Sequence, residues 1–405
     1  MFRMLFMFMT VVFLTPGQSM AEFRRSENRV HERYVVRLAD DFPGSVAAAA
    51  RSFARLHGAK VVHVYESSIK GFAVKMPESA AIALSRNPVI RSVTEDAAFS
   101  LANVQAGAHF GLDRIDQRDL PVDGLYHYGP EPGRFVQVYV IDSGVDLHND
   151  IAGQVVTRIN FESQGTGDVC GLPSCLADCY GHGTSVASVI AGQLSGVAKA
   201  AEIISIKIYD CNGNAYISDL IAGIDWMTSR KMATPWIAAV ANMSFATPQW
   251  PDIDDAVLQA VFRDITVVAA AGNGPYPQYI GRDACNYSPG HLGAATAGVI
   301  TVAASDTSDT RPTFSNWGPC ADMFAPGTAI RVAMAGTTSS YDFVSGTSFA
   351  APLVAGEAAR RLGIYAYYGP DQVEALIKGA ATPNRIQNTM STPNLLLHIP
   401  FQIWD

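Results

Sequence analysis

The stretch Val136-Gln137-Val138-Tyr139-Val140-Ile141-Asp142 decides the fold class of this 405-residue chain. Its nearly continuous apolar run ends in a single carboxylate, and such runs are typical of parallel strands that are buried on both faces. Four more runs of this kind follow, at 203–209, 237–242, 265–270 and 299–303. We therefore expect a central parallel sheet.

Helical patterns separate these runs. They lie at 185–191, 218–227, 254–262 and 350–362, and one more follows at 372–378. Strands that alternate with helices imply right-handed crossovers around one sheet. Residues 108–405 are thus predicted to form a doubly wound, mostly parallel α/β domain with flanking helices, whose ligands lie beyond the carboxyl ends of the strands.

The first 21 residues have the layout of a secretory signal peptide. Arg3 precedes an apolar stretch, and small residues occupy the cleavage positions before residue 22. The apolar stretch is too short to span a membrane, and no long apolar run follows it. We expect a secreted, extracellular protein without a membrane span.

Residues 22–107 have a different character. Strand patterns at 34–38, 61–65, 71–76 and 90–95 alternate with helical patterns at 46–57 and 79–86. Two helices against a four-stranded sheet suit an α+β core at about 33–96. This part is either an independent binding domain or a removable pro-segment. Its position after the signal peptide, and the patternless run at 97–108, favour a pro-segment.

Charge and cysteine content narrow the function classes. Residues 1–107 carry 13 Lys and Arg against 9 Asp and Glu, whereas the remainder carries 16 against 28. An acidic main body argues against nucleic-acid binding, which needs a basic face. The six cysteines of an exported chain predict three disulfides, and six cysteines permit 15 pairings.

Three distant segments carry groups that suit nucleophilic catalysis. Asp142 ends a buried strand, His182 lies between two glycines in Gly181-His182-Gly183, and Ser348 lies among small residues in Gly346-Thr347-Ser348. Singly, each is more typical of a structural residue. Together they supply a nucleophile, a general base and a carboxylate that orients the base.

A helix is expected to start near Ser348. Pro352 is expected in its first turn, where a missing N–H has little effect.

The chain order of the three groups separates two architectures. An α/β-hydrolase has the order Ser, acid, His, whereas here the order is Asp, His, Ser. The order therefore argues against a lipase or esterase.

These segments resemble the Asp, His and Ser motifs of the subtilisin-like serine peptidases, in particular the proteinase K and aqualysin-type branch. The resemblance extends from about Arg33 to the C-terminus, and residues 33–96 resemble the inhibitory pro-segment of that family. It implies that Asp142, His182 and Ser348 form the catalytic triad. It also implies that Asn273, in Ala271-Gly272-Asn273, is the oxyanion-hole asparagine.

The resemblance also implies the walls of the substrate cleft. These are Ser244, Phe245 and Ala246 on a substrate-lining strand, Gly213 on the opposite edge, and Ala270, Ala271 and Gly272 as a second wall. The first specificity pocket is expected to be apolar. Ala246-Thr247 replaces a Gly-Gly pair of the family, which is expected to narrow the outer subsites.

Disulfides and a metal site follow from the same resemblance. It implies the pairs Cys179–Cys211 and Cys285–Cys320, which leaves Cys170 and Cys175 to close a small loop. It also implies a structural calcium at Asp322 with the carbonyls of Ala297 and Val299. No cofactor is expected for the chemistry itself.

The sequence thus predicts a secreted serine endopeptidase that is made as a zymogen. Its partners are protein or peptide substrates and its own pro-segment, which acts as an intramolecular inhibitor. The protein is expected to be a monomer. The alternative is a catalytically silent binding protein that keeps the subtilase frame.

Overall fold

The structure is a computed structural model that describes residues 22–25, 29–97, 103–130, 132–162 and 176–400. The chain divides into two compact units, which separate between residues 100 and 101. Among the described residues, no helix has the length and apolarity that are needed to cross a membrane.

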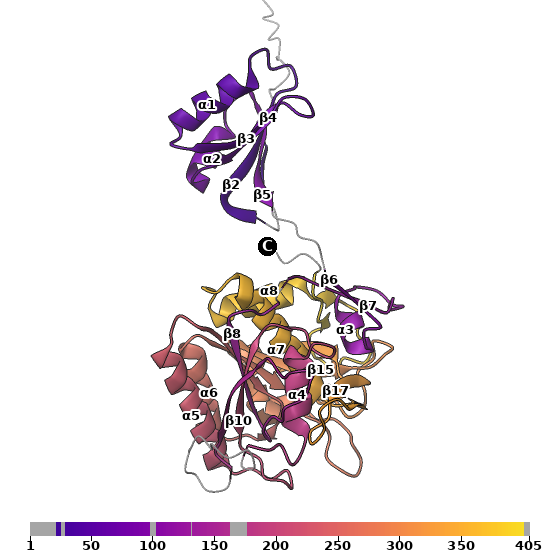
Figure 1. Cartoon of the computed structure of the whole chain (residues 1–405). Coiled ribbons are helices and arrows are strands. Elements are labelled where there is room, and N and C mark those ends of the chain that lie inside the picture. Colours follow the sequence, from indigo (N-terminus) through magenta and orange to yellow (C-terminus); the bar gives the residue numbers. More distant parts are fainter. Residues whose placement is uncertain (1–21, 26–28, 98–102, 131, 163–175, 401–405) are drawn as a thin grey trace, which may run out of the picture. The chain divides into compact units, whose positions relative to one another are not determined.

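The N-terminal unit is a sheet covered by two helices (Figure 1). Its strand order is β1-β5-β2-β4-β3. Side chains that alternate along β2, such as Tyr34, Val36 and Leu38, pack in a core of their own with the buried face of α1. The bounds are β1 (Glu22–Arg24), β2 (Arg29–Leu38), α1 (Val46–Leu56), β3 (Lys60–Tyr65), β4 (Gly71–Lys75), α2 (Glu78–Leu84) and β5 (Ile90–Ala97).

This unit confirms the predicted two helices and four strands and adds a fifth strand. β1 pairs in parallel with β5, from Glu22 opposite Ser92 to Arg24 opposite Thr94. Three residues are too few to show an alternating pattern, so only the neighbouring strand defines β1.

The C-terminal unit is built on a nine-stranded sheet in the order β19-β20-β16-β15-β13-β11-β8-β10-β9. In this sheet every pair of neighbouring strands is parallel except β19 with β20, which is antiparallel. The strands are β8 (Val136–Asp142), β9 (Val155–Asn160), β10 (Glu202–Lys207), β11 (Ala238–Met243), β13 (Ile265–Ala270), β15 (Val299–Ser305), β16 (Met323–Pro326), β19 (Thr382–Pro383) and β20 (Leu395–Leu396).

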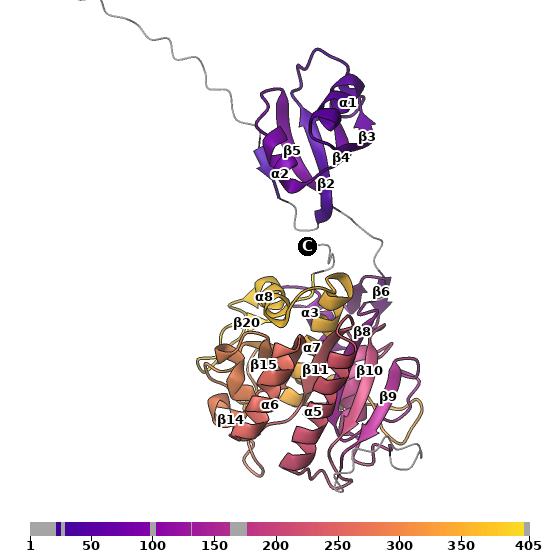
Figure 2. The same cartoon turned by 90° about the vertical axis from the view of Figure 1, so that its left-hand side faces the viewer.

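Helices cover both faces of this sheet (Figure 2). α5 (Ile217–Ala233) and α6 (Pro251–Phe262) pack on one face. α4 (His182–Ala191) and α7 (Thr347–Ile364) pack on the other, and α8 (Pro370–Ala380) lies beside α7. Two helical layers around a parallel sheet confirm the predicted doubly wound α/β fold.

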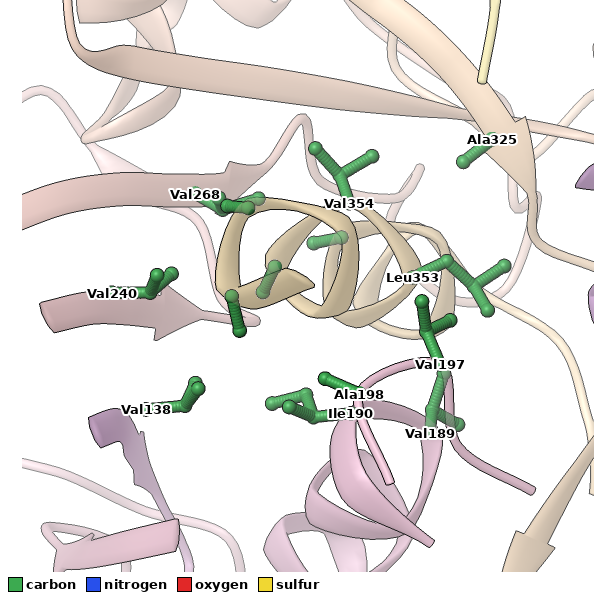
Figure 3. Close-up of a cluster of buried hydrophobic side chains, with 14 of the residues drawn as sticks. Val138, Val189, Ile190, Val197, Ala198, Val240, Val268, Ala325, Leu353 and Val354 are labelled. Carbon is green, nitrogen blue, oxygen red and sulfur yellow. The ribbon is translucent and has the colours of Figure 1, made fainter. Parts of the chain in front are cut away.

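The core between the sheet and α7 is densely apolar. Val138, Val240 and Val268 on three adjacent strands point toward α7, and Ile190 of α4 closes the space beside them (Figure 3). All four side chains are fully buried or nearly so. This core fixes α7 against the central strands.

Smaller elements complete the unit. They are α3 (Phe110–Ile115), the pair β6 (Asn103–Ala106) with β7 (Leu125–Tyr128), β12 (Thr247–Pro248) with β14 (Tyr287–Ser288), β17 (Ile330–Ala333) with β18 (Tyr341–Val344), and the 3₁₀ turns η2 (Ala284–Asn286) and η3 (Gly290–Ala295).

The strand β6 corrects the interpretation of residues 97–108. We predicted that residues 97–108 lack regular structure, and the end of the pro-segment at residue 107 stays a prediction. Instead, Asn103 to Ala106 pair with β7, so these residues belong to the larger unit. The four residues have little apolar pattern, and the antiparallel partner alone makes them a strand.

Candidate active site

The groups singled out in the sequence lie at one edge of the central sheet. Asp142 is the last residue of β8, His182 is the first residue of α4, and Ser348 is the second residue of α7. β8 lies where the strand order reverses, with β10 on one side and β11 on the other. Such switch points open a crevice beyond the carboxyl ends of the strands.

Asp142 and His182 form a direct pair. The imidazole Nδ1 lies 2.8 Å from Asp142 Oδ1 and 3.0 Å from Oδ2. The carboxylate is almost fully buried, whereas a quarter of the imidazole side chain is exposed. With Nδ1–H donated to the carboxylate, Nε2 is left as the basic nitrogen on the exposed side.

The charge around His182 favours its protonated form. Burial by itself would lower the pKa of His182, but the charge and hydrogen bond of Asp142, with the charge of Asp178, raise it above the usual value. The imidazole is therefore a stronger base than an isolated histidine.

Asp178 is a second buried carboxylate near His182 that sequence reasoning missed. It accepts hydrogen bonds from the Gly181 N–H at 2.8 Å, the Thr184 N–H at 2.7 Å, and the hydroxyls of Thr184 and Ser143 at 2.6 and 2.7 Å. These donors flank His182 on both sides, so Asp178 holds the backbone that carries the imidazole. Its position four residues before His182 is the sequence feature from which it could have been predicted.

Ser348 lies close to this pair but does not bond to it. In the described part of the chain, no hydrogen bond joins the Ser348 hydroxyl to the His182 ring. The ring of the next residue, Phe349, lies 5.4 Å from the imidazole centroid, and the two side chains line one hollow of about 670 Å³. Hydrogen bonds between a nucleophile and its base are often long before substrate binds.

The first residue of α7 holds the side-chain oxygen of Asn273. Its Oδ1 accepts from the Thr347 N–H at 3.1 Å and from the Thr347 hydroxyl at 3.2 Å. Asn273 itself is exposed. The Nδ2 group lies beside Gly346, two residues before Ser348, because a Cβ built on Gly346 would be 3.6 Å from this nitrogen.

A buried asparagine fixes the segment before Asn273. The N–H and Nδ2 of Asn316 donate to the carbonyls of Gly272 and Ala271, both at 2.9 Å. Gly272 has a φ of +94°, and a Cβ there would lie 2.7 Å from Asn316 Nδ2. Only glycine fits this position, and neither Asn316 nor Thr347 was among the predicted residues.

The predicted cleft walls come together around the same edge. Gly213 and Ser244 line one cavity of about 230 Å³ with Asp142 and His182. Ser244, Phe245 and Ala246 directly follow β11, and Ala270 ends the adjacent β13, which continues into Ala271 and Gly272. A Cβ on Gly272 would lie 2.8 Å from the Ala246 Cβ, so the two walls approach closely at this point.

Comparisons with known proteins identify this architecture. Residues 133–395 match the Subtilase family of serine peptidases. The chain belongs to the subtilase family. Residues 11–102 of this subtilase match the Peptidase inhibitor I9 family, so it combines a subtilisin-like serine peptidase domain with an N-terminal inhibitor-type pro-domain.

Individual relatives agree with this assignment. The subtilase is 39% identical over 361 residues to an extracellular serine proteinase of Thermus sp. (strain Rt41A), covering 89% of this chain and 82% of the relative. It is 33% identical over 380 residues to the alkaline serine protease ver112 of Corniculantispora psalliotae, covering 93% and 89%. A solved structure of a cold adapted subtilisin-like serine proteinase is 36% identical, with a TM-score of 0.64 over 72% of this chain and 98% of that one.

Two disulfides of the subtilase agree with the family resemblance. Cys179 pairs with Cys211, and Cys285 pairs with Cys320. The first links the segment before His182 to the turn that carries Gly213. The predicted pair Cys170–Cys175 lies outside the described residues.

The surroundings of Asp322 do not fit the predicted calcium ion. One oxygen of this buried carboxylate accepts from the Thr301 N–H at 2.8 Å, and the other lies 2.9 Å from the Lys378 ammonium. Lys378 also contacts Glu374, whose second oxygen accepts from the N–H of Gly298, between Ala297 and Val299. The ammonium of Lys378 thus contacts the carboxylate that was expected to bind calcium.

The start of α7 also differs from the prediction. The helix begins at Thr347, so Pro352 is its sixth residue and lies in the second turn, not the first. The apolar spacing of 353–359 located the helix but could not show that Thr347 and Ser348 belong to it.

Proposed function

We propose that this subtilase is a secreted serine endopeptidase that is made as a zymogen and cleaves peptide bonds through Asp142, His182 and Ser348. The observation that carries the proposal is the 2.8 Å contact from Asp142 to His182, at the edge where α7 presents Ser348. A buried carboxylate, an imidazole with a free Nε2 and a hydroxyl at a helix start are the parts that acyl transfer needs.

The proposed chemistry needs no cofactor. Ser348 Oγ attacks the carbonyl carbon of the scissile bond while His182 Nε2 takes its proton. Asn273 Nδ2 and the Ser348 N–H then donate to the oxyanion of the tetrahedral intermediate. His182 protonates the leaving amine, and a water that is deprotonated by His182 releases the acyl group from Ser348.

Export and self-inhibition belong to the same proposal. The signal-like residues 1–21 and the match to an inhibitor family over 11–102 support synthesis as an exported precursor. The pro-segment would act as the intramolecular inhibitor until it is removed. Protein or peptide chains would bind along Ser244 to Ala246, as an added strand beside the end of β11.

A serine-directed fluorophosphonate tests the proposal. We expect the purified mature protein to be labelled at Ser348 and to hydrolyse casein, and we expect Ser348→Ala to lose the label and at least about 10⁴-fold of the turnover. A folded mature protein that takes up no label would instead be a silent binding protein. Faster turnover of long-chain esters than of casein would indicate a lipase or esterase.

A further inference from the structure

One helical hydrogen bond is missing near the start of α7, at Ser348. In an α-helix, the N–H of each residue donates to the carbonyl four residues earlier. Pro352 has no N–H, and the residue four positions before it is Ser348. The helix therefore leaves open the backbone carbonyl of the residue that carries the proposed nucleophile.

A side chain from the sheet takes this place. The hydroxyl of Ser244 donates to the Ser348 carbonyl at 2.8 Å, across 104 residues of sequence. Ser244 is only 3% exposed, so water competes little for this bond. Ser244, the first residue after β11, thereby fixes the position of the Ser348 carbonyl.

A third residue sets the direction of the Ser244 hydroxyl. The side-chain amide of Asn242 donates to Ser244 Oγ at 2.9 Å. Because the hydroxyl oxygen accepts this bond, its single proton is available for the Ser348 carbonyl. The chain of hydrogen bonds from Asn242 through Ser244 to Ser348 therefore has one direction.

Packing does not account for an asparagine at position 242. Side chains two apart in a strand share a face, and Val240 of β11 points into the apolar layer under α7 (Figure 3). Asn242 is fully buried, and its Oδ1 has no hydrogen-bond partner among the described residues. An unpaired buried oxygen lowers stability, so an apolar residue would serve the core better.

We propose that Ser244 is a positioning residue for the nucleophile. Its hydroxyl replaces the helical hydrogen bond that Pro352 removes, and so fixes the backbone from which Ser348 Oγ projects. Ser244 is also the first residue of the segment proposed to bind substrate. The same residue would therefore take part in substrate binding and in the alignment of the nucleophile. The inference rests on the proposed role of Ser348.

The first test removes the hydroxyl. For the mature enzyme with a peptide anilide substrate, we expect Ser244→Ala to lower kcat about tenfold, the effect of one hydrogen bond, with KM changed less than about twofold. The rate of fluorophosphonate labelling at Ser348 should fall in parallel. Ser188→Ala is the matched control. Ser188 is fully buried, and its hydroxyl donates to the Ser185 carbonyl at 2.7 Å and accepts from the Ala333 N–H at 2.9 Å, with no hydrogen bond to Ser348 in the described part of the chain.

The second test restores the missing donor. Pro352→Ala supplies an N–H that can donate to the Ser348 carbonyl, so it should make the Ser244 hydroxyl redundant. We expect Ser244→Ala to cost about tenfold in kcat with Pro352 present but less than about threefold in the Pro352→Ala background. Unfolding temperatures of all four proteins separate this effect from a loss of folded enzyme.

Three results would overturn the inference while the proposed function stands. They are an unchanged kcat in Ser244→Ala, an equal loss in Ser188→Ala, and a loss in Ser244→Ala that Pro352→Ala does not reduce. If wild-type enzyme is not labelled at Ser348, the proposed function fails and this inference fails with it.

Discussion

Asp178 acts on the site through the backbone and through its charge. Its four hydrogen bonds hold the turn on both sides of His182, and its negative charge helps to raise the pKa of that histidine. Asp178 itself is buried, with 3% exposure, so its charge is poorly screened. Two carboxylates thus act on the pKa of the imidazole, and among the described residues Asp142 is the one that contacts it.

This arrangement predicts a pH effect. His182 must be neutral to act as a base, so kcat/KM rises with pH through its pKa. Asp178→Asn removes a negative charge, which lowers the pKa of His182 and moves the acid limb of the kcat/KM profile to lower pH. The profile is measured with a peptide anilide.

Asp371→Asn is the control, because Asp371 is an exposed carboxylate in the first turn of α8. It makes the same change in net charge and should leave the acid limb in place. An acid limb that stays fixed in Asp178→Asn, or moves equally in both variants, would refute the role of Asp178.

At the scale of elements, ion pairs of Lys378 hold α8 against the sheet. Lys378 bridges Asp322, just before β16, and Glu374, which caps the turn at Gly298 before β15. Burial would lower the pKa of Lys378, but Asp322 and Glu374 raise it above its usual value, so the ammonium stays charged. Asp322 is almost fully buried and burial raises its pKa, whereas about a third of the Lys378 side chain is exposed, so removing Lys378 leaves a buried charge without its partner.

We therefore predict that the Asp322 region is stabilised by lysine and not by calcium. In enzyme whose Ser348 is blocked by an inhibitor, Lys378→Met and Asp322→Asn should each lower the unfolding temperature by roughly 5–10 °C. The decrease should be the same in calcium and in chelator, as measured by calorimetry. The double variant should lose less than the sum of the two single losses.

A calcium ligand would behave differently. Asp322→Asn would then destabilise the enzyme in calcium but hardly at all in chelator, and Lys378→Met would keep the stabilising effect of calcium. That pattern would restore the calcium site that the family resemblance implied.

At the scale of the whole molecule, two separate cores lie on one chain. The N-terminal unit has its own apolar cluster around Val36 and Phe72, and the larger unit has others. β6 pairs with β7 inside the larger unit, whereas β5 ends at Ala97 in the smaller one. A cut between these two strands would leave both cores intact.

We predict that the precursor cuts itself between Ala97 and Asn103. Mass spectrometry of the secreted wild-type protein should show a mature N-terminus in this interval, and Ser348→Ala should keep the pro-segment attached. A mature chain that begins after Ala106 would lack β6 and contradict the prediction. Processing of Ser348→Ala at the same place would mean that another peptidase makes the cut.

Much of the larger unit could be predicted from local sequence. The buried strands β8, β10, β11, β13 and β15 are continuous apolar runs, because both of their faces are covered by helices. Four strands of the nine-stranded sheet, β9, β16, β19 and β20, were not predicted. β9 is partly exposed, β16 ends in a proline, and β20 has two residues, so pairing with a neighbour defines each of them.

The sequence by itself determined the fold class, the order of the three reactive groups and the family, because each depends on a short pattern of neighbouring residues. Only the tertiary structure decided which buried polar groups support them. Ser244 meets Ser348 across 104 residues, and Lys378 meets Asp322 across 56. A hydrogen bond or ion pair depends on distance in space, which a one-dimensional pattern does not contain.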